Sequence, residues 1–173
     1  VQIADPNIPA LSGDTYQVGS EGQLAWVADR VAEGNSAINA KLTADMDLGG
    51  IDWQPIGDAT HPFGGVLDGD SHTIRNLTVS DRSNAGLFGI VKGGAISGLT
   101  FETPRLVYAK AASNVGVVCG QLLPHSRTAY VLNCAVNGGQ LNAYNGSADW
   151  GGIVGRAGEN TALFACSFEG ELR

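Results

Sequence analysis

The chain has 173 residues, a formal net charge of −7 at neutral pH, and 25 glycines, about twice the roughly 7% that is usual in proteins. Its length favours one domain with a substantial core, and it contains no apolar run of about 18 residues that could cross a bilayer. With 10 basic residues against 17 acidic ones and no basic cluster, the chain lacks the charge needed to bind nucleic acid or anionic lipid.

The first periodic element is a helix over about residues 21–33. Ser20 followed three positions later by Gln23 has the form of a capping box. Apolar residues then recur at helical spacing, at Leu24, Val27, Ala28 and Val31. Gly34 stands where a helix ends with a left-handed residue. Because this helix is short and amphipathic, we expect it to lie against an apolar surface.

After residue 39, two short sequence patterns alternate along the chain. The first pattern is found in IRNLTV (74–79), ISGLTF (96–101), VLNCAV (131–136) and LFACSF (163–168). The second is found in AGLFG (85–89), VVCG (117–120) and GGIVG (151–155). Starts of the first pattern lie 22, 35 and 32 residues apart, which is the length of one turn of a solenoid.

The third position of the first pattern predicts a bend in each turn. Asn76, Gly98 and Asn133 occupy it in the first three copies, and Asn and Gly tolerate positive φ most readily. A bend there would keep the apolar residues on both sides of it inside the column. Ala165 fits less well, so we expect the last turn to bend differently.

Stacked turns would place equivalent side chains about 4.8 Å apart. The first pattern therefore predicts two interior rows, one of Leu77, Leu99, Cys134 and Cys166, and one of Val79, Phe101, Val136 and Phe168. The three cysteines, Cys119, Cys134 and Cys166, are too few and too widely spaced for a disulfide framework or a zinc site, so we expect buried core residues. Cys134 and Cys166 could lie close enough to pair if their turns are adjacent, although we expect free thiols.

These repeats resemble the GLUG-motif proteins, which are bacterial surface and secreted proteins named for short Gly-Leu-hydrophobic-Gly repeats. The motif stands at residues 86–89 (GLFG) and 152–155 (GIVG), whereas the copy at 117–120 (VVCG) lacks the first glycine, with Gly116 one residue earlier. The upstream segments LTADMDLGGIDWQPIG and FGGVLDGDSHTIRNL also resemble the family. Such blocks occur in large adhesins and in non-catalytic regions of immunoglobulin-A peptidases.

The resemblance implies a fold and carries no catalytic residues. It implies an all-β solenoid, a right-handed parallel β-helix of about four coils with an N-terminal capping α-helix. The expected single domain, 1–173, then comprises an extended lead-in (1–15), a capping-helix region (16–39) and β-helix coils (40–173). We expect it to be a fragment of a longer protein.

An acidic stretch around residues 45–72 raises the question of a chemical site. In DGDSH (68–72), Asp and Gly are the residues that a tight turn needs, and we expect His72 to brace that turn. A calcium site built from Asp45, Asp47, Asp68 and Asp70 is an alternative, because calcium prefers such hard oxygen ligands. A catalytic pair of carboxylates, as in polysaccharide-cleaving enzymes, is a second one.

The loop sequence LNAYNGSADWGG (141–152) is the other candidate site. Trp150 and Tyr144 are the aromatic residues most open to a sugar or a protein partner, because loops on a rigid solenoid often bind ligands. The alternative is that Trp150 only covers the side of the coil.

Three functional hypotheses follow, none of which requires a cofactor other than the calcium considered above. The first is a non-enzymatic adhesin-like or stalk module, extracellular or on the bacterial cell surface, that binds a host protein or glycan. The second is a polysaccharide-acting β-helix enzyme, and the third is a non-catalytic region of a surface peptidase. Outward residues become more apolar towards the C-terminus, in the order Arg75, Ser97, Leu132 and Phe164. We expect further polypeptide beyond Arg173, or a second copy, to cover that end.

Overall fold

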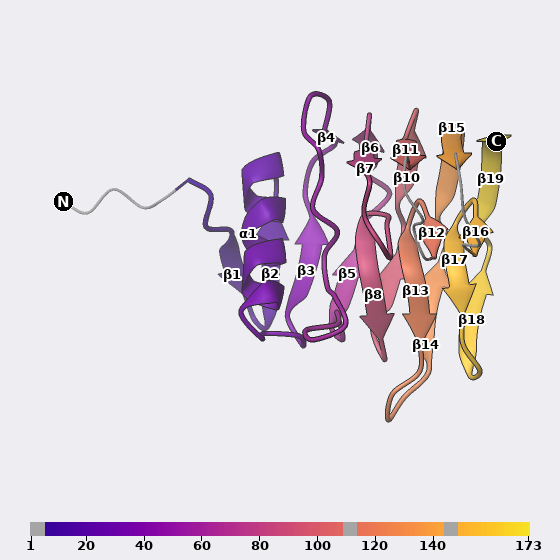
Figure 1. Ribbon diagram of the computed structural model, residues 1–173. Helices are drawn as coiled ribbons and strands as arrows, with labels where there is room; N and C mark the ends of the chain where they lie inside the picture. The colour runs from indigo at the N-terminus through magenta and orange to yellow at the C-terminus, as the bar shows by residue number, and fades with distance from the viewer. Residues whose placement is uncertain (1–5, 109–113, 144–148) are drawn as a thin grey trace.

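The computed structural model describes residues 6–108, 114–143 and 149–173, which form a column of stacked strands (Figure 1). The chain is an all-β parallel solenoid of about four turns with one short helix near the N-terminus. The predicted fold class is therefore confirmed.

Three faces of the column are built from parallel strands. The first holds β2 (Thr15–Val18), β3 (Asn39–Leu42), β5 (Val66–Asp68), β9 (Ala95–Ser97), β14 (Ala129–Leu132) and β18 (Thr161–Phe164). The second holds β4 (Met46–Asp47), β6 (Thr73–Arg75), β7 (Thr78–Ser80), β10 (Thr100–Glu102), β11 (Arg105–Tyr108), β15 (Ala135–Ala143) and β19 (Ser167–Leu172). The third holds β8 (Phe88–Lys92), β13 (Cys119–Leu123) and β17 (Val154–Ala157), beside the short pair β12 (Val115–Gly116) and β16 (Trp150–Gly151).

The helix α1 (Glu21–Ala32) closes one end of the column (Figure 1). The predicted N-cap forms, because the Gln23 backbone N–H donates to Ser20 Oγ at 3.2 Å. The return bond of the capping box is shifted by one residue, since the Gln23 side chain accepts from the Gly19 N–H at 2.8 Å rather than from that of Ser20. Leu24, Val27 and Val31 are buried and join the same core as the strands. Over the described residues, no helix has both the length and the apolar character needed to cross a bilayer.

The stacking begins earlier in the chain than expected. β1 (Ala10–Ser12) pairs antiparallel with β2, and β2 pairs in parallel with β3. Part of the expected lead-in, and part of the expected capping region, thus already form rungs of the first face. The sequence gives little signal for this hairpin, because its strands are only three and four residues long and flank a single turn at 13–14.

Interior rows run along the column as predicted from Leu99 and Phe101 onward. The Ala135 N–H donates to Leu99 O at 2.9 Å and the Ser167 N–H to Cys134 O at 3.0 Å, which stacks Leu99, Cys134 and Cys166. All three cysteines are free thiols. Burial raises the pKa of the Cys134 thiol to about 11 and raises that of Cys119 further.

The predicted places of Leu77 and Val79 in these rows are wrong. Leu77 O accepts from Arg105 N–H, and Val79 pairs with Leu106. The residue that faces Phe101 in the preceding turn is Ile74. The corresponding row therefore reads Met46, Ile74, Phe101, Val136 and Phe168.

A longer corner in the turn that contains β5 and β6 explains this shift. Leu67 pairs with Ile96, and Ile74 pairs with Phe101. Ile74 lies seven positions after Leu67, whereas Phe101 lies only five positions after Ile96. The extra residues belong to the DGDSH turn, in which Asp70 and Ser71 have φ of 47° and 66°. This segment is a corner, as its sequence predicted.

The bends predicted at the third position are present. Gly98 and Asn133 have φ of 66° and 50°, and Asn76 bends a neighbouring corner at 56°. Ala165 adopts φ of 52°, so the expectation that the last turn bends differently is wrong. Stacking on Asn133 imposes the shape of the preceding turn on Ala165, since the Asn133 N–H donates to Phe164 O at 2.9 Å.

The glycine repeat has a structural cause. The last glycine of each copy lies against the backbone of the preceding turn, so a Cβ on Gly89, Gly120 or Gly155 would come within 2.4–2.5 Å of Gly57 O, Asn84 C or Val115 N, respectively. Gly116 pairs with Gly151 rather than with Gly152. The copy at 117–120, which lacks the first glycine of the motif, thus has Gly116 at the structurally equivalent position, one residue earlier in the sequence.

The rung at the far end of the column is exposed. Leu163 pairs with the fully buried Val131 yet is 43% exposed, and Phe164 is 70% exposed beside the half-buried Leu132. The increase in apolar character along this outer row matches the sequence, although Arg75 belongs to another row, where it pairs with Glu102. Coverage of this end by further polypeptide or by a second copy stays a prediction.

Candidate functional site

Asp45 lies just before β4 and is held by residues of the next turn. Its Oδ1 accepts from the Thr73 backbone N–H at 3.0 Å and lies 3.1 Å from His72 Nδ1. Its Oδ2 lies 3.4 Å from Arg75, which reaches onward to Glu102 at 2.8 Å. His72 thus braces the corner as expected, and the group forms a polar chain across three turns.

Asp47 has a similar role one corner further along. Its Oδ1 accepts from the Gly49 N–H at 2.8 Å and from Asn76 Nδ2 at 2.9 Å. Asn76 in turn accepts from the Thr103 hydroxyl at 2.8 Å. Asp47 is therefore a cap that links its own turn to the next one.

Asp68 and Asp70 both lie near the ammonium group of Lys41. Lys41 Nζ lies 3.1 Å from Asp70 Oδ2 and 3.9 Å from Asp68 Oδ2, and Asp68 Oδ1 accepts from the Asp70 N–H at 2.9 Å. Within the described ranges, no group of three or more His, Cys, Asp or Glu side chains is arranged to hold a metal ion. The calcium site stays an untested prediction.

The electrostatics of these carboxylates suit bracing better than acid catalysis. The Thr73 N–H and then His72 hold the pKa of Asp45 below its ordinary value, and Asn76 and then Gly49 do the same for Asp47. A general acid needs a raised pKa at neutral pH, which burial or a nearby negative charge would supply. Both groups are solvent-accessible and are held in the ionised form.

The lowered pKa of Asp45 predicts a loss of stability in acid. A depressed pKa in the folded state stabilises the fold above the unfolded value of about 3.9, and this stabilisation is lost as the pH falls through the folded pKa. Removing the carboxylate with Asp45→Asn should lower the thermal midpoint at pH 7 and have less effect near pH 2, as followed by circular dichroism. Glu169→Gln, which removes an exposed carboxylate, is the control and should not reproduce this pattern. An equal loss at both pH values would contradict the prediction.

Trp150 is less open than its loop sequence suggested. It starts β16, is half-buried and packs against the core. Tyr144 lies outside the described residues, so the aromatic ligand site stays a prediction. Trp53, by contrast, is buried in a corner, where its Nε1–H donates to Leu87 O at 3.0 Å.

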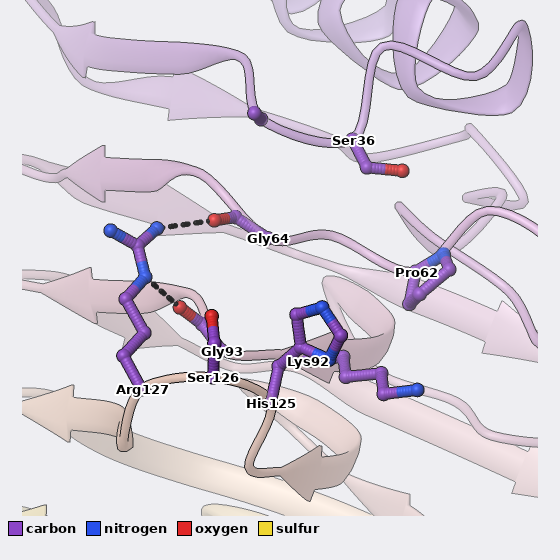
Figure 2. Close-up of a pocket in the computed structure, with 9 residues that line it drawn as sticks. Ser36, Pro62, Gly64, Lys92, Gly93, His125, Ser126 and Arg127 are labelled. Carbon is purple, nitrogen blue, oxygen red and sulfur yellow. Dashed lines mark hydrogen bonds between the residues drawn. The ribbon is translucent and has the colours of Figure 1, made fainter.

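The structure adds a site that the sequence reasoning missed, a hollow of about 450 Å³ that we call the corner hollow (Figure 2). It lies where the chain enters strands β3, β5, β9 and β14, and its lining contains three basic side chains and no carboxylate. It is lined by Ser36, Ala37, Pro62, Gly64, Lys92, Gly93, His125, Ser126 and Arg127.

Arg127 is fixed across two neighbouring turns of this corner. Its Nε donates to Gly93 O and its Nη2 to Gly64 O, both at 2.6 Å (Figure 2). Gly93 has φ of 69°, and a Cβ there would lie 2.8 Å from His125 Cβ. A glycine at position 93 thus leaves room for His125, while Arg127 ties the turns together.

A signal for the corner hollow was present in the sequence. Gly64, Lys92 and Arg127 each precede a strand of the first face, and those strands are in register. Aligning the turns from Leu67 rather than Ile74 would have brought these residues together. The shifted alignment of the first turn hid them.

No protein-family model matches the chain. Halomucin of Haloquadratum walsbyi is 31% identical over 120 residues, 66% of this chain. A protein of Evansella cellulosilytica named "Putative Gly-rich membrane protein" is 33% identical over 88 residues, 44% of this chain. The matched segments span 1% and 10% of these relatives' own lengths.

Among solved structures, the fold is similar to the crystal structure of "a putative immunoglobulin A1 protease" from Bacteroides ovatus. The TM-score is 0.53, the sequence identity is 19%, and the match covers 86% of this chain and 63% of that one. At this identity the likeness concerns the fold alone. The chain thus has the parallel solenoid of a protein named as a peptidase and sequence similarity to pieces of much longer proteins.

Proposed function

We propose that this chain is a non-catalytic module of a bacterial cell-surface or secreted protein, of the GLUG-repeat type, that acts as a rigid stalk or adhesin-like scaffold. The observation that carries the proposal is the bracing role of its acidic residues. Asp45, Asp47, Asp68 and Asp70 each contact backbone, a basic side chain or an amide at the corners. Such contacts stabilise a column, and the lowered pKa values of Asp45 and Asp47 make these two unsuited to act as general acids.

The names of the similar proteins support a surface or secreted location and say nothing of an adhesive role. One is named as a membrane protein, and the structural neighbour as an immunoglobulin A1 protease. The in-register glycines Gly89, Gly120 and Gly155 give the GLUG resemblance a physical basis, because each is required by a close backbone approach. A second candidate, the non-catalytic region of a surface peptidase, is favoured by the peptidase-named neighbour.

Turnover assays test the non-catalytic part of the proposal. The purified chain is incubated with oligogalacturonate, chondroitin sulfate and immunoglobulin A1, and new reducing ends and new peptide fragments are measured. We expect no turnover above that of an Asp45→Asn/Asp68→Asn double variant. Turnover by the natural chain that this variant lacks would overturn the proposal in favour of an enzyme.

Labelling of intact cells tests the location. Antibodies against the folded chain should label intact cells that express the whole protein, or precipitate that protein from the culture medium. Labelling only after the cells are permeabilised would contradict a surface or secreted location.

A further inference from the structure

We propose that the corner hollow binds an acidic saccharide, through a carboxylate or sulfate group held by Lys92, His125 and Arg127. This inference goes beyond the scaffold role and does not depend on it, since either a scaffold or an enzyme could carry such a site. It rests on the charges, contacts and size of the hollow.

The charge of the hollow is opposite to that of the chain. The net charge is −7, yet the lining contains Lys92, His125 and Arg127 and no Asp or Glu. A local concentration of basic groups on an acidic surface attracts and orients an anion.

Lys92 and Arg127 make no ion pair with a carboxylate of the described residues. Five basic side chains form ion pairs, namely Arg30, Lys41, Arg75, Arg82 and Arg173. In the part of the chain that the structure describes, four do not: Lys92, Arg105, Arg127 and Arg156. Two of these four lie in one hollow, where an external anion can pair with them.

The guanidinium of Arg127 is positioned before any ligand arrives. Its bonds to Gly93 O and Gly64 O use Nε and one N–H of Nη2, which leaves the second N–H of Nη2 for a ligand, whereas Nη1 points away from His125 and Lys92 (Figure 2). Holding the side chain in advance reduces the entropy lost on binding, and the planar guanidinium suits carboxylate and sulfate oxygens. Figure 2 shows the His125 ring between Arg127 and the Lys92 ammonium in this view.

The remaining lining favours a sugar over a bare ion. A volume of about 450 Å³ exceeds what a small inorganic anion fills and falls within the usual range for small-molecule sites. Ser36 and Ser126 offer hydroxyls that can bond to ring hydroxyl groups, and Ala37 and Pro62 offer apolar surface for the ring itself. The occupant that fits is therefore a ring that carries both hydroxyls and an acid.

Titration with defined saccharides tests the proposal. Oligogalacturonate and 3′-sialyllactose supply a carboxylate, a chondroitin sulfate disaccharide supplies a sulfate, and lactose is the uncharged control. Binding is followed by calorimetry and by the amide and side-chain NMR signals of residues 92–94 and 125–127. We expect saturable binding of at least one acidic saccharide, weakened by salt, and none of lactose. Binding of the carboxylate-bearing or of the sulfate-bearing saccharides shows which acid group the hollow accepts.

Lys92→Gln is the main variant, because Lys92 is exposed and has no ion pair, so the fold should tolerate its loss. Arg156→Gln is the matched control, since it removes the same charge from an exposed site on β17. We expect Lys92→Gln to weaken binding about tenfold and Arg156→Gln to leave it unchanged. The proposal would be overturned if no acidic saccharide bound saturably, or if lactose bound equally well. It would also be overturned if the two variants had equal effects, or if the NMR signal changes were confined to residues outside 92–94 and 125–127. None of these outcomes would bear on the non-catalytic role, which the turnover assays test separately.

Discussion

Replacing Gly120 with alanine should lower the free energy of unfolding by about 3 kcal/mol. Gly120 lies in β13, and a Cβ there would come within 2.5 Å of Asn84 C and 2.6 Å of Asn84 Cα. Both atoms are backbone and cannot rotate away, so two stacked turns would have to separate locally. Chemical denaturation followed by circular dichroism measures the loss.

Gly158→Ala is the control for this prediction. The nearest atoms to a Cβ at that position are side-chain carbons, Pro124 Cδ at 3.2 Å and Leu123 Cδ2 at 3.3 Å. These can shift by a few tenths of an ångström, so the loss should stay below about 1 kcal/mol. If the two alanines cost the same, close backbone approach is not the reason for the glycine repeat.

Truncating Phe101 to alanine should destabilise the chain by about 4 kcal/mol. Phe101 is fully buried between Ile74 and Val136 in the interior row. Its loss removes apolar contacts with the turns on both sides and leaves a cavity that parallel strands, fixed by their hydrogen bonds, cannot close. The free energy of unfolding from denaturant titration is the measurement.

Phe164→Ala is the matched aromatic control, because Phe164 is 70% exposed. It should change stability by less than about 0.5 kcal/mol. A small loss at Phe101 together with a larger one at Phe164 would show that the column is not held by its interior rows.

Local features of the sequence were enough to predict the capped helix and the corners. Ser20, Gln23 and Gly34 specify the two ends of α1 through contacts within a few residues, and Gly98 and Asn133 specify bends through their own backbone preferences. Ala165 shows the limit of this reasoning, since its positive φ of 52° follows from the turn on which it stacks and not from its own side chain.

Alignment between turns could be predicted only where the corner between the first-face and second-face strands has the same length in each turn. From Phe101 onward the predicted rows are correct, because Ile96 and Val131 lie five residues before Phe101 and Val136, respectively. In the turn of β5 and β6 the longer DGDSH corner shifts the match, and sequence similarity favoured the wrong register. Pairing energy between strands, which depends on residues far apart in the chain, settles such a choice.

The sequence by itself determined the class of the fold, since repeated apolar segments separated by Gly, Asn and Asp can bury their side chains only by stacking. It also determined where the chain bends and where the helix begins and ends. Tertiary structure alone decided that the acidic residues brace successive turns, and that Lys92, His125 and Arg127 share one hollow. The physical reason is that both depend on which turns lie above one another, and a separation of 35 residues along the chain becomes a neighbouring position only once the strands are paired.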